Sequence, residues 1–157
     1  MRALVITASN RAAAGIYEDK SGKLLAELLA GAGCEVDGPQ VVPDGDPVEA
    51  ALRAGVAEGY DVIVTTGGTG LTPADLTPEA TGRVLDREIP GIAEAIRQAD
   101  RDRVPTSILS RGLAGQAGGS LIVNLPGSSG GVRDGMAVLL PVLEHAVDQI
   151  RGGDHPR

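Results

Sequence analysis

The chain of 157 residues has no phenylalanine, no tryptophan, two tyrosines and a single cysteine. Without large aromatic rings, its core has to be built from Val, Leu, Ile and Ala. The single cysteine, Cys34, excludes an internal disulfide and a cysteine-based zinc site. We expect Cys34 to be a packed or half-exposed small residue, and a cytoplasmic location is the simplest interpretation of this composition.

Membrane segments and an excess of positive charge are also missing. The apolar stretch from Ala3 to Ile6 begins without the cationic start of a signal peptide, and no run approaches the about 18 apolar residues of a membrane span. The formal net charge is -7. This charge argues against a nucleic acid partner, because nucleic acids are bound by clustered Lys and Arg. A small phosphorylated ligand remains compatible, since a few N–H groups and one or two Arg can hold it.

Apolar strands alternate with amphipathic segments, which is typical of a mostly parallel sheet with helices on both faces. Strands are expected at residues 2–8, 35–42, 62–65 and 121–124. Helices are expected from Ser21 to about Gly31, from Pro47 to Gly59, over 78–88 and 91–103, and from about Met136 to Ile150 with a bend at Pro141. Residues 9–20 and 112–119 are expected to be loops, and 106–110 a short strand or turn. The charged residues of 94–103 are expected to form a solvated helix face. We predict one α/β domain over residues 1–150 and a flexible tail over 151–157.

One segment combines a buried strand, a glycine loop and a carboxylate. The strand 62–65 is followed by Thr66-Gly67-Gly68-Thr69-Gly70, by Asp75, and by a helix that Thr77 can cap and Pro78 can begin. Glycines let backbone N–H groups approach an anion, and a helix start adds further N–H groups. An ordinary strand-to-helix turn is the alternative, and a Gly-Gly pair alone in a chain with 23 glycines would favour it. The ordered series favours a phosphate site with a metal ligand attached.

Polar or glycine residues follow each of the four expected strands. The strands are followed by Ser9-Asn10-Arg11, by Pro43-Asp44, by residues 66–75 and by residues 124–129. Ligands of an open parallel sheet bind beyond the carboxyl ends of its strands. Asp44 and Asp75 would then share one rim, where two carboxylates suit Mg²⁺. This set suits nucleotidyl transfer, which needs positioning and charge neutralisation more than a nucleophilic side chain.

Other catalytic and phosphate motifs fit less well. The glycine loop is neither a dinucleotide-binding fingerprint nor a P-loop. Neither histidine lies in a loop where it could activate a Ser or Cys nucleophile. A histidine that the fold brings close to such a nucleophile remains an alternative.

Seven ordered segments carry a family resemblance. They are Ser9-Asn10-Arg11, 15–22, Val42-Pro43-Asp44, 66–70 with 75–81, 87–91, Leu109-Ser110-Arg111 and 124–128. Together they resemble the molybdenum-cofactor biosynthesis family of the Mog/MoaB type, the molybdopterin adenylyltransferases, which also occur as a domain of gephyrin and its plant relatives. The resemblance covers nearly the whole chain.

The resemblance implies a three-layer α/β/α fold of the molybdopterin-binding-domain type and a homotrimer. It implies transfer of AMP from Mg-ATP to the terminal phosphate of molybdopterin, with release of pyrophosphate. Asp44 and Asp75 are implied as the catalytic and Mg²⁺-binding carboxylates. The implied molybdopterin contacts are Thr66, Gly67, Gly68, Thr69, Gly70, Pro126, Gly127 and Ser128. The implied nucleotide contacts are Ser9, Asn10, Arg11, Gly15, Tyr17 and Asp19. Much of the family has Asp where this chain has Asn10, so the role of that position stays open.

Two alternatives belong to other classes. The chain could bind molybdopterin without catalysis, which the presence of both Asp44 and Asp75 counts against. It could also be a scaffold that channels an intermediate to a metal-insertion partner enzyme, although it has no room for the further domains of larger insertases. In each case the expected ligands are small molecules, with no nucleic acid and no membrane.

Overall fold

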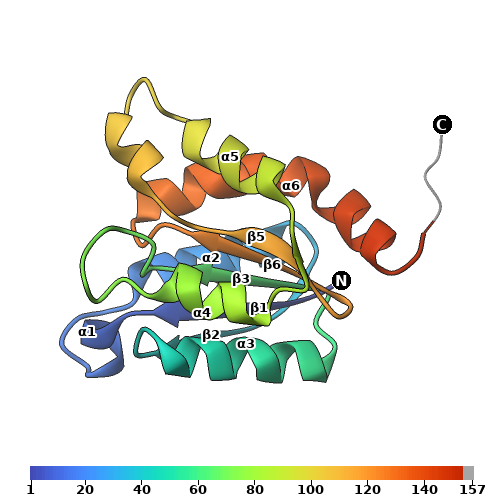
Figure 1. Ribbon diagram of the computed structural model, residues 1–157, viewed down its shortest axis with the longest axis horizontal. Coiled ribbons are helices and arrows are strands. Elements are labelled where there is room, and N and C mark those ends of the chain that lie inside the picture. Colours follow the sequence, from blue (N-terminus) through green and yellow to red (C-terminus); the bar gives the residue numbers. More distant parts are fainter. Residues whose placement is uncertain (154–157) are drawn as a thin grey trace.

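A six-stranded sheet lies between two helical layers in the computed structural model, which describes residues 1–153 (Figure 1). Four strands, β1 (Arg2–Ala8), β2 (Glu35–Val42), β3 (Val62–Thr66) and β6 (Ser120–Leu125), pair in parallel in the order β2-β1-β3-β6. The predicted α/β class and mostly parallel sheet are confirmed. Among residues 1–153, no helix has both the length and the apolar character that a membrane crossing requires.

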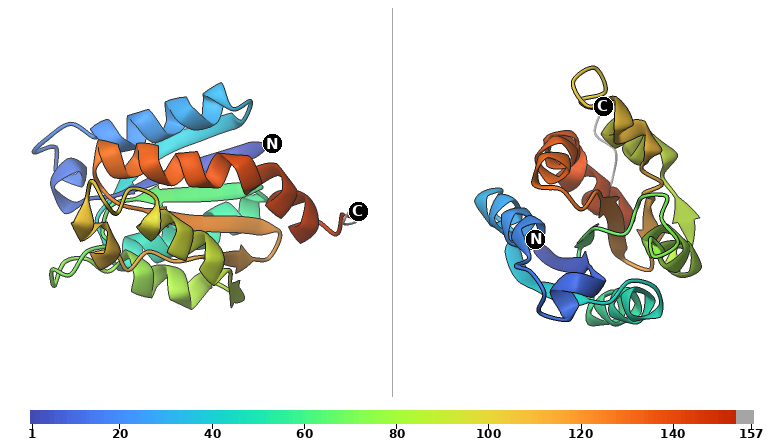
Figure 2. Two further views of the ribbon diagram at one scale, coloured as in Figure 1. Left: turned by 90° about the horizontal axis from the view of Figure 1, so that it is seen from above. Right: turned by 90° about the vertical axis from the view of Figure 1, so that its left-hand side faces the viewer.

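The helices divide between the two faces of the sheet, as Figure 2 shows. One layer contains α2 (Lys20–Gly31), α5 (Pro90–Gln98) and α6 (Ser129–Ile150), and the other contains α3 (Asp46–Glu58) and α4 (Thr77–Val84). Alternate residues of β1 serve the two layers: Ala3 and Val5 pack toward α2 and α6, whereas Leu4 and Ile6 pack toward α3. The core is aliphatic, as the composition predicts, and each fully buried Leu or Ile contributes roughly 1.5–3 kcal/mol.

The sheet continues beyond β6 with two strands that the sequence did not indicate. β5 (Ala114–Ala117) runs antiparallel to β6, and β4 (Arg87–Glu88) pairs antiparallel with β5. The predicted loop over 112–119 is therefore wrong, and so is the end of the helix expected over 78–88. The segment around β5 is rich in Gly and Ala, which have little strand propensity, so pairing with β6 decides its conformation. Gly115 lies so close to β4 that a Cβ atom there would stand 2.4 Å from the Arg87 carbonyl oxygen.

Helix starts also differ from the predictions. α2 begins at Lys20 and is capped by Asp19, not by Ser21, because the Asp19 carboxylate accepts a hydrogen bond from the Gly22 N–H. The expected loop over 9–20 contains a short helix, α1 (Asn10–Ala13), capped by Ser9. Thr77 does not cap α4; it is the first residue of that helix, and its hydroxyl donates to Asp44.

The bounds of α5 and α6, and the segment between α5 and β5, differ from the predictions. α5 stops at Gln98 rather than Arg103, and the backbone of Val104 lies outside the helical region, which a following proline disfavours. Residues Pro105–Leu109 form a 3-10 helix, η1, where a strand or turn was expected. α6 begins earlier than expected, at Ser129, and includes Pro141.

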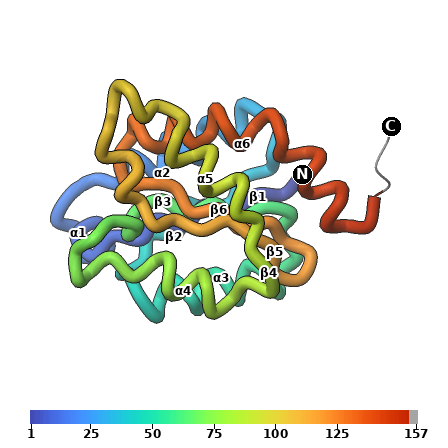
Figure 3. Tube along the Cα trace, turned by 45° about the horizontal axis from the view of Figure 1, so that its top comes forward, coloured from blue at the N-terminus to red at the C-terminus, as the bar shows by residue number. Residues whose placement is uncertain are grey.

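The start of β1 and the carboxyl ends of the parallel strands lie at opposite ends of the molecule (Figure 3). The start of β1 and the end of α6 lie together, while α1 marks the end at which the parallel strands exit. Arg151 hydrogen-bonds to the carbonyls of Gly119 and Gly59 and pairs with Asp61. The flexible tail over 151–157 stays a prediction, and residues 154–157 lie outside the described part of the chain.

Candidate functional site

The loops that follow β3 and β6 touch each other at the carboxyl edge of the sheet. The Thr66 hydroxyl donates to the Pro126 carbonyl at 2.7 Å, and the Gly67 N–H donates to the Leu125 carbonyl at 3.1 Å. A Cβ atom at Gly127 would lie only 3.2 Å from the Gly67 Cα. The parallel register of β3 and β6 thus brings together two segments that are about 60 residues apart.

The first of these loops needs its glycines. Gly67 and Gly68 have φ values of 95° and 70°, which L side chains rarely adopt. A Cβ atom at Gly67 would lie 2.4 Å from the Ala8 carbonyl oxygen, and one at Gly68 would lie 2.2 Å from Oδ2 of Asp44. The loop is therefore packed against β1 on one side and against Asp44 on the other.

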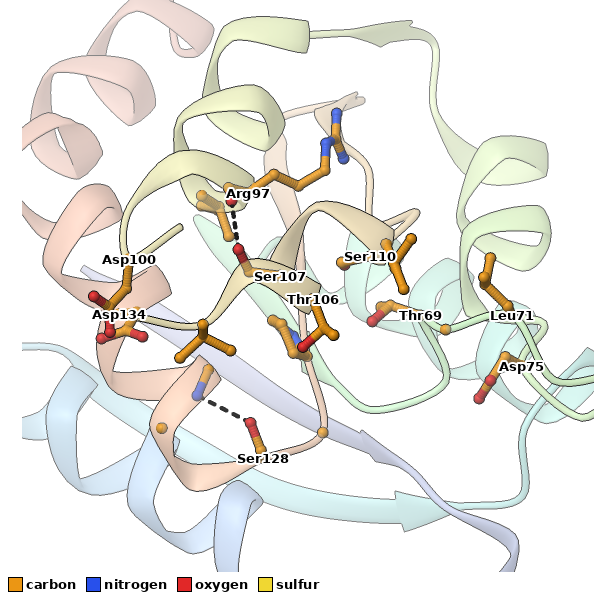
Figure 4. A pocket seen from close by; sticks show the side chains of 18 of the residues that line it. Thr69, Leu71, Asp75, Arg97, Asp100, Thr106, Ser107, Ser110, Ser128 and Asp134 are labelled. Carbon is orange, nitrogen blue, oxygen red and sulfur yellow. Dashed lines mark hydrogen bonds between the residues drawn. The ribbon is translucent and has the colours of Figure 1, made fainter. Parts of the chain in front are cut away.

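A cavity of about 660 Å³ opens beside this loop (Figure 4). Its walls are formed by Gly68–Gly70 with Asp75, by residues 126–128 and the first turn of α6, and by the segment from α5 to η1. We call it the larger cavity. In Figure 4, Asp75 lies with Thr69 and Leu71 on one side, and Asp100 and Asp134 lie together on another. Arg103 pairs with both of these aspartates, and its hydrogen bond to Asp100 raises the pKa of the guanidinium.

The smaller cavity, of about 420 Å³, lies at the same carboxyl edge of the sheet. It is lined by residues 7–9 and 17–21, by Thr66 and Gly67, and by Gly127 and Ser129. Several of its side chains form hydrogen bonds with one another. The Ser9 and Tyr17 hydroxyls are hydrogen-bonded at 2.8 Å, and Thr7 Oγ1 donates to the Asp19 carboxylate at 2.7 Å. Gly127 is a lining residue of both cavities.

The residues predicted to contact molybdopterin divide between the two cavities. Gly68, Thr69 and Gly70 line the larger cavity together with Pro126, Gly127 and Ser128. Thr66 and Gly67 line the smaller one. The glycine loop, which was expected to line one site, therefore contributes to two cavities. The chain passes from the smaller to the larger between Gly67 and Gly68.

The residues predicted to contact the nucleotide are only partly brought together. Ser9, Tyr17 and Asp19 line the smaller cavity, whereas Asn10, Arg11 and Gly15 line neither cavity. Asn10 Oδ1 accepts a hydrogen bond from the backbone N–H of Asp44 at 3.0 Å. An aspartate at this position could accept the same bond.

The two predicted metal-binding carboxylates differ in how many hydrogen bonds they accept from the protein. Asp44 accepts three hydrogen bonds, from the Gly45 N–H and the Thr77 hydroxyl on Oδ1 and from the Leu76 N–H on Oδ2. Asp75 accepts two, both on Oδ2 and both from Thr72. A carboxylate offers about four acceptor positions. Asp75 therefore keeps one oxygen open and lines the larger cavity, while Asp44 is committed mainly to joining β2 to the start of α4.

Magnesium bound with ATP fits this donor set. Residues 1–153 contain no group of three or more His, Cys, Asp or Glu side chains that could enclose a metal ion. Mg²⁺ keeps several waters and binds through one or two carboxylates together with substrate phosphates, so it does not need such a group. The open oxygen of Asp75 faces the larger cavity and can serve Mg²⁺, whereas Asp44 lines neither cavity and keeps one acceptor position.

Sequence reasoning missed several residues of the larger cavity. Asp100 and Arg103 were expected on a solvated helix face, yet they line its wall together with Asp134 of α6. No local signal marks them, because the chain between α5 and η1 reaches the cavity only in the folded protein. Arg111 was quoted in a motif without a role, and it proves to hold the loop that carries Asp75.

Comparisons with known proteins identify a family and several related proteins. A family model described as a probable molybdopterin binding domain matches residues 4–145. A molybdopterin adenylyltransferase of Helicobacter pylori strain J99 is 40% identical over 153 residues, which cover 94% of this chain and 86% of that protein. A molybdenum cofactor biosynthesis bifunctional protein of Synechococcus elongatus is 41% identical over 98% of this chain, but this chain spans only 48% of it.

Solved structures agree with the sequence matches. The molybdopterin biosynthesis Mog protein from Mycobacterium ulcerans superposes with a TM-score of 0.91 at 54% identity, covering 94% of this chain and 97% of that one. The resemblance seen in the ordered motifs is confirmed.

Proposed function

This chain belongs to the family of probable molybdopterin binding domains, and we propose that it is a molybdopterin adenylyltransferase. In the proposed reaction, an oxygen of the molybdopterin phosphate forms a bond to the α-phosphorus of ATP. The bond from that phosphorus to the bridging oxygen breaks, and pyrophosphate leaves. The relative from Helicobacter pylori, named for this activity, spans nearly the same length of sequence, which supports the proposal.

The observation that carries the proposal is that two cavities share Gly127 as a lining residue, and that Asp75 lines the larger of the two. A transfer enzyme has to hold two substrates with their reacting atoms in contact, and such positioning supplies much of the catalysis. The larger cavity would take molybdopterin and the smaller one would take part of ATP. The phosphates would then lie at the glycines between them.

Backbone groups rather than side chains would hold these phosphates. The Gly68–Gly70 segment and the first turn of α6 both line the larger cavity. Ser128 caps α6 by accepting a hydrogen bond from the Gly131 N–H at 3.0 Å, and the 22-residue helix directs its positive dipole end to the cavity. An anion at this point would be stabilised without a clustered Lys or Arg patch, consistent with the acidic net charge.

Asp75 and Asp44 are the residues that would hold Mg²⁺, with Asp75 the principal one because its Oδ1 is open. Magnesium supplies neutralisation of the phosphate charge that develops during transfer. Asp44 contributes chiefly by fixing the Gly68 turn, Leu76 and Thr77. The homotrimer, the cytoplasmic location and a metal-insertion partner stay predictions.

A pyrophosphate-release assay with the purified chain, molybdopterin, ATP and Mg²⁺ tests the proposal. Release that depends on all three additions is the expected result. Binding of molybdopterin without release would instead favour the passive binding protein. The several protein hydrogen bonds on Asp44 give that alternative a specific basis, since they explain this carboxylate without a metal.

A further inference from the structure

The loop from Gly70 to Asp75, which we call the Asp75 loop, has little packing of its own. Residues 71–74 are all exposed, and the Leu71 side chain is among the most exposed apolar side chains, at 65%. Inside the loop, Thr72 and Asp75 hydrogen-bond to each other through backbone and side chain. Such a local turn fixes the shape of the loop but not its position relative to the cavity.

Arg111 ties both ends of the Asp75 loop to the rest of the protein. Its Nε donates to the Gly70 carbonyl at 2.9 Å, and its Nη2 donates to the Asp75 carbonyl at 2.8 Å. Its backbone N–H donates to the Thr69 carbonyl at 2.8 Å. The third nitrogen of the guanidinium, Nη1, pairs with Glu79 in the first turn of α4. One side chain therefore connects the start of the loop, its end and the following helix.

The chemistry of arginine suits this task. A guanidinium presents its N–H groups in a rigid planar fork, so it can hold two carbonyls and a carboxylate at fixed relative positions. Lysine is a single flexible donor group and cannot reproduce that arrangement. Glu79 balances the charge, so Arg111 is already engaged within the protein and is suited to holding the loop rather than the substrate.

We propose that Arg111, paired with Glu79, is a positioning residue that sets where the Asp75 carboxylate stands in the larger cavity. The proposal rests on the proposed function for its consequence, because Asp75 is the carboxylate assigned to the magnesium of ATP. A displacement of about 1 Å in a catalytic group can lower a rate about 100-fold. Arg111 would therefore act on the rate through Asp75 without touching either substrate.

The test replaces Arg111 by Lys and compares it with a matched control, Arg53→Lys. Arg53 also donates to a helix glutamate and to a backbone carbonyl, those of Glu49 and Arg83, but it lies on α3 away from both cavities. We expect kcat to fall about 100-fold in Arg111→Lys, with molybdopterin affinity within about threefold of the parent. Arg53→Lys should keep the parental kcat. Glu79→Gln, which removes only the balancing charge, should show a smaller loss in the same direction.

Two readouts separate positioning from a general structural role. Hydrogen exchange of the Thr72 and Asp75 amides should be faster in Arg111→Lys than in the parent or in Arg53→Lys, while amides of β3 stay unchanged. In an Asp75→Asn background, Arg111→Lys should cost little further rate, because the group that it positions is already disabled.

Each contrary result has a definite meaning. Unchanged exchange of the Asp75 loop would overturn the proposal, as would a full additional rate loss in the Asp75→Asn background. If Arg111→Lys does not fold, Glu79→Gln is measured in the same way, and unchanged loop exchange and rate in that variant would overturn the proposal. If the parent itself releases no pyrophosphate, the proposed function fails, and hydrogen exchange still decides whether Arg111 orders the loop.

Discussion

The two cavities differ in what forms their walls. The larger cavity combines bare glycine backbone, a helix start and the Asp75 carboxylate with its open oxygen, and its walls come from segments spread between residues 68 and 134. The smaller cavity is formed largely by residues 7–9 and 17–21, whose side chains hydrogen-bond to one another. The difference indicates that backbone geometry decides binding in the larger cavity and that a local side-chain network decides it in the smaller. Substitutions in the two should therefore have separable effects.

The largest effect is expected from Asp75→Asn in the larger cavity. The change keeps the shape of the side chain and removes the charge that would hold magnesium, so the transfer rate should fall about 100- to 1,000-fold. The amide oxygen can still accept hydrogen bonds from Thr72, and the melting temperature should stay close to that of the parent. Pyrophosphate release and a thermal melt of the same preparation measure both. A rate within threefold of the parent would show that Asp75 is not the metal ligand.

A second prediction tests the backbone of the larger cavity through Gly68→Ala. The added Cβ would meet Asp44 Oδ2 and Thr77 Oγ1, and the residue would be held at φ 70°. Strain at such a position costs about 1–3 kcal/mol, so both stability and molybdopterin affinity should fall, the latter about tenfold. Gly91→Ala is the control, since a Cβ there meets nothing within 4 Å. Calorimetric titration of molybdopterin that gives equal affinity in parent and Gly68→Ala would exclude phosphate binding at this loop.

The same contrast explains what the sequence could and could not predict. The parallel strands were predictable because Val62 to Thr65 and Leu121 to Asn124 are buried runs that local composition reveals. The glycine loops and Asp75 were predictable because each directly follows such a strand. The strand β5 was not, since its Ala and Gly residues acquire their conformation from pairing with β6. The wall made by Asp100, Arg103 and Asp134 was not predictable either, because it joins α6 to a turn some 30 residues earlier.

The third prediction concerns Asp44, whose carboxylate joins the end of β2 to the start of α4. In Asp44→Asn one oxygen becomes an NH₂ group, which would face N–H donors that now point at Asp44. Leaving such donors unsatisfied costs about 1–3 kcal/mol, so the free energy of unfolding should fall by that amount, unlike in Asp75→Asn. Asp46→Asn is the control, because the Asp46 side chain is 100% exposed. Urea unfolding compares the three variants, and equal midpoints for the parent and Asp44→Asn would show that Asp44 is not a structural link.

The smallest effect is expected in the smaller cavity, from Tyr17→Phe. The change removes the hydrogen bond between the Tyr17 and Ser9 hydroxyls and leaves the ring in place. Because Tyr17 is 52% exposed, water can replace part of that bond. The net loss should then be about 0.5–1.5 kcal/mol. The KM for ATP should rise by roughly two- to tenfold, while the affinity for molybdopterin should not change.

The other tyrosine of the chain supplies the control for this last prediction. Tyr60 donates to Asp37 at the opposite end of the sheet, and Tyr60→Phe removes an equivalent hydroxyl far from both cavities. Its effect should be confined to stability, with the KM for ATP unchanged. A rise in molybdopterin Kd in Tyr17→Phe, or equal KM changes in the two variants, would mean that the smaller cavity does not bind the nucleotide separately. The two cavities would then have to be treated as one site.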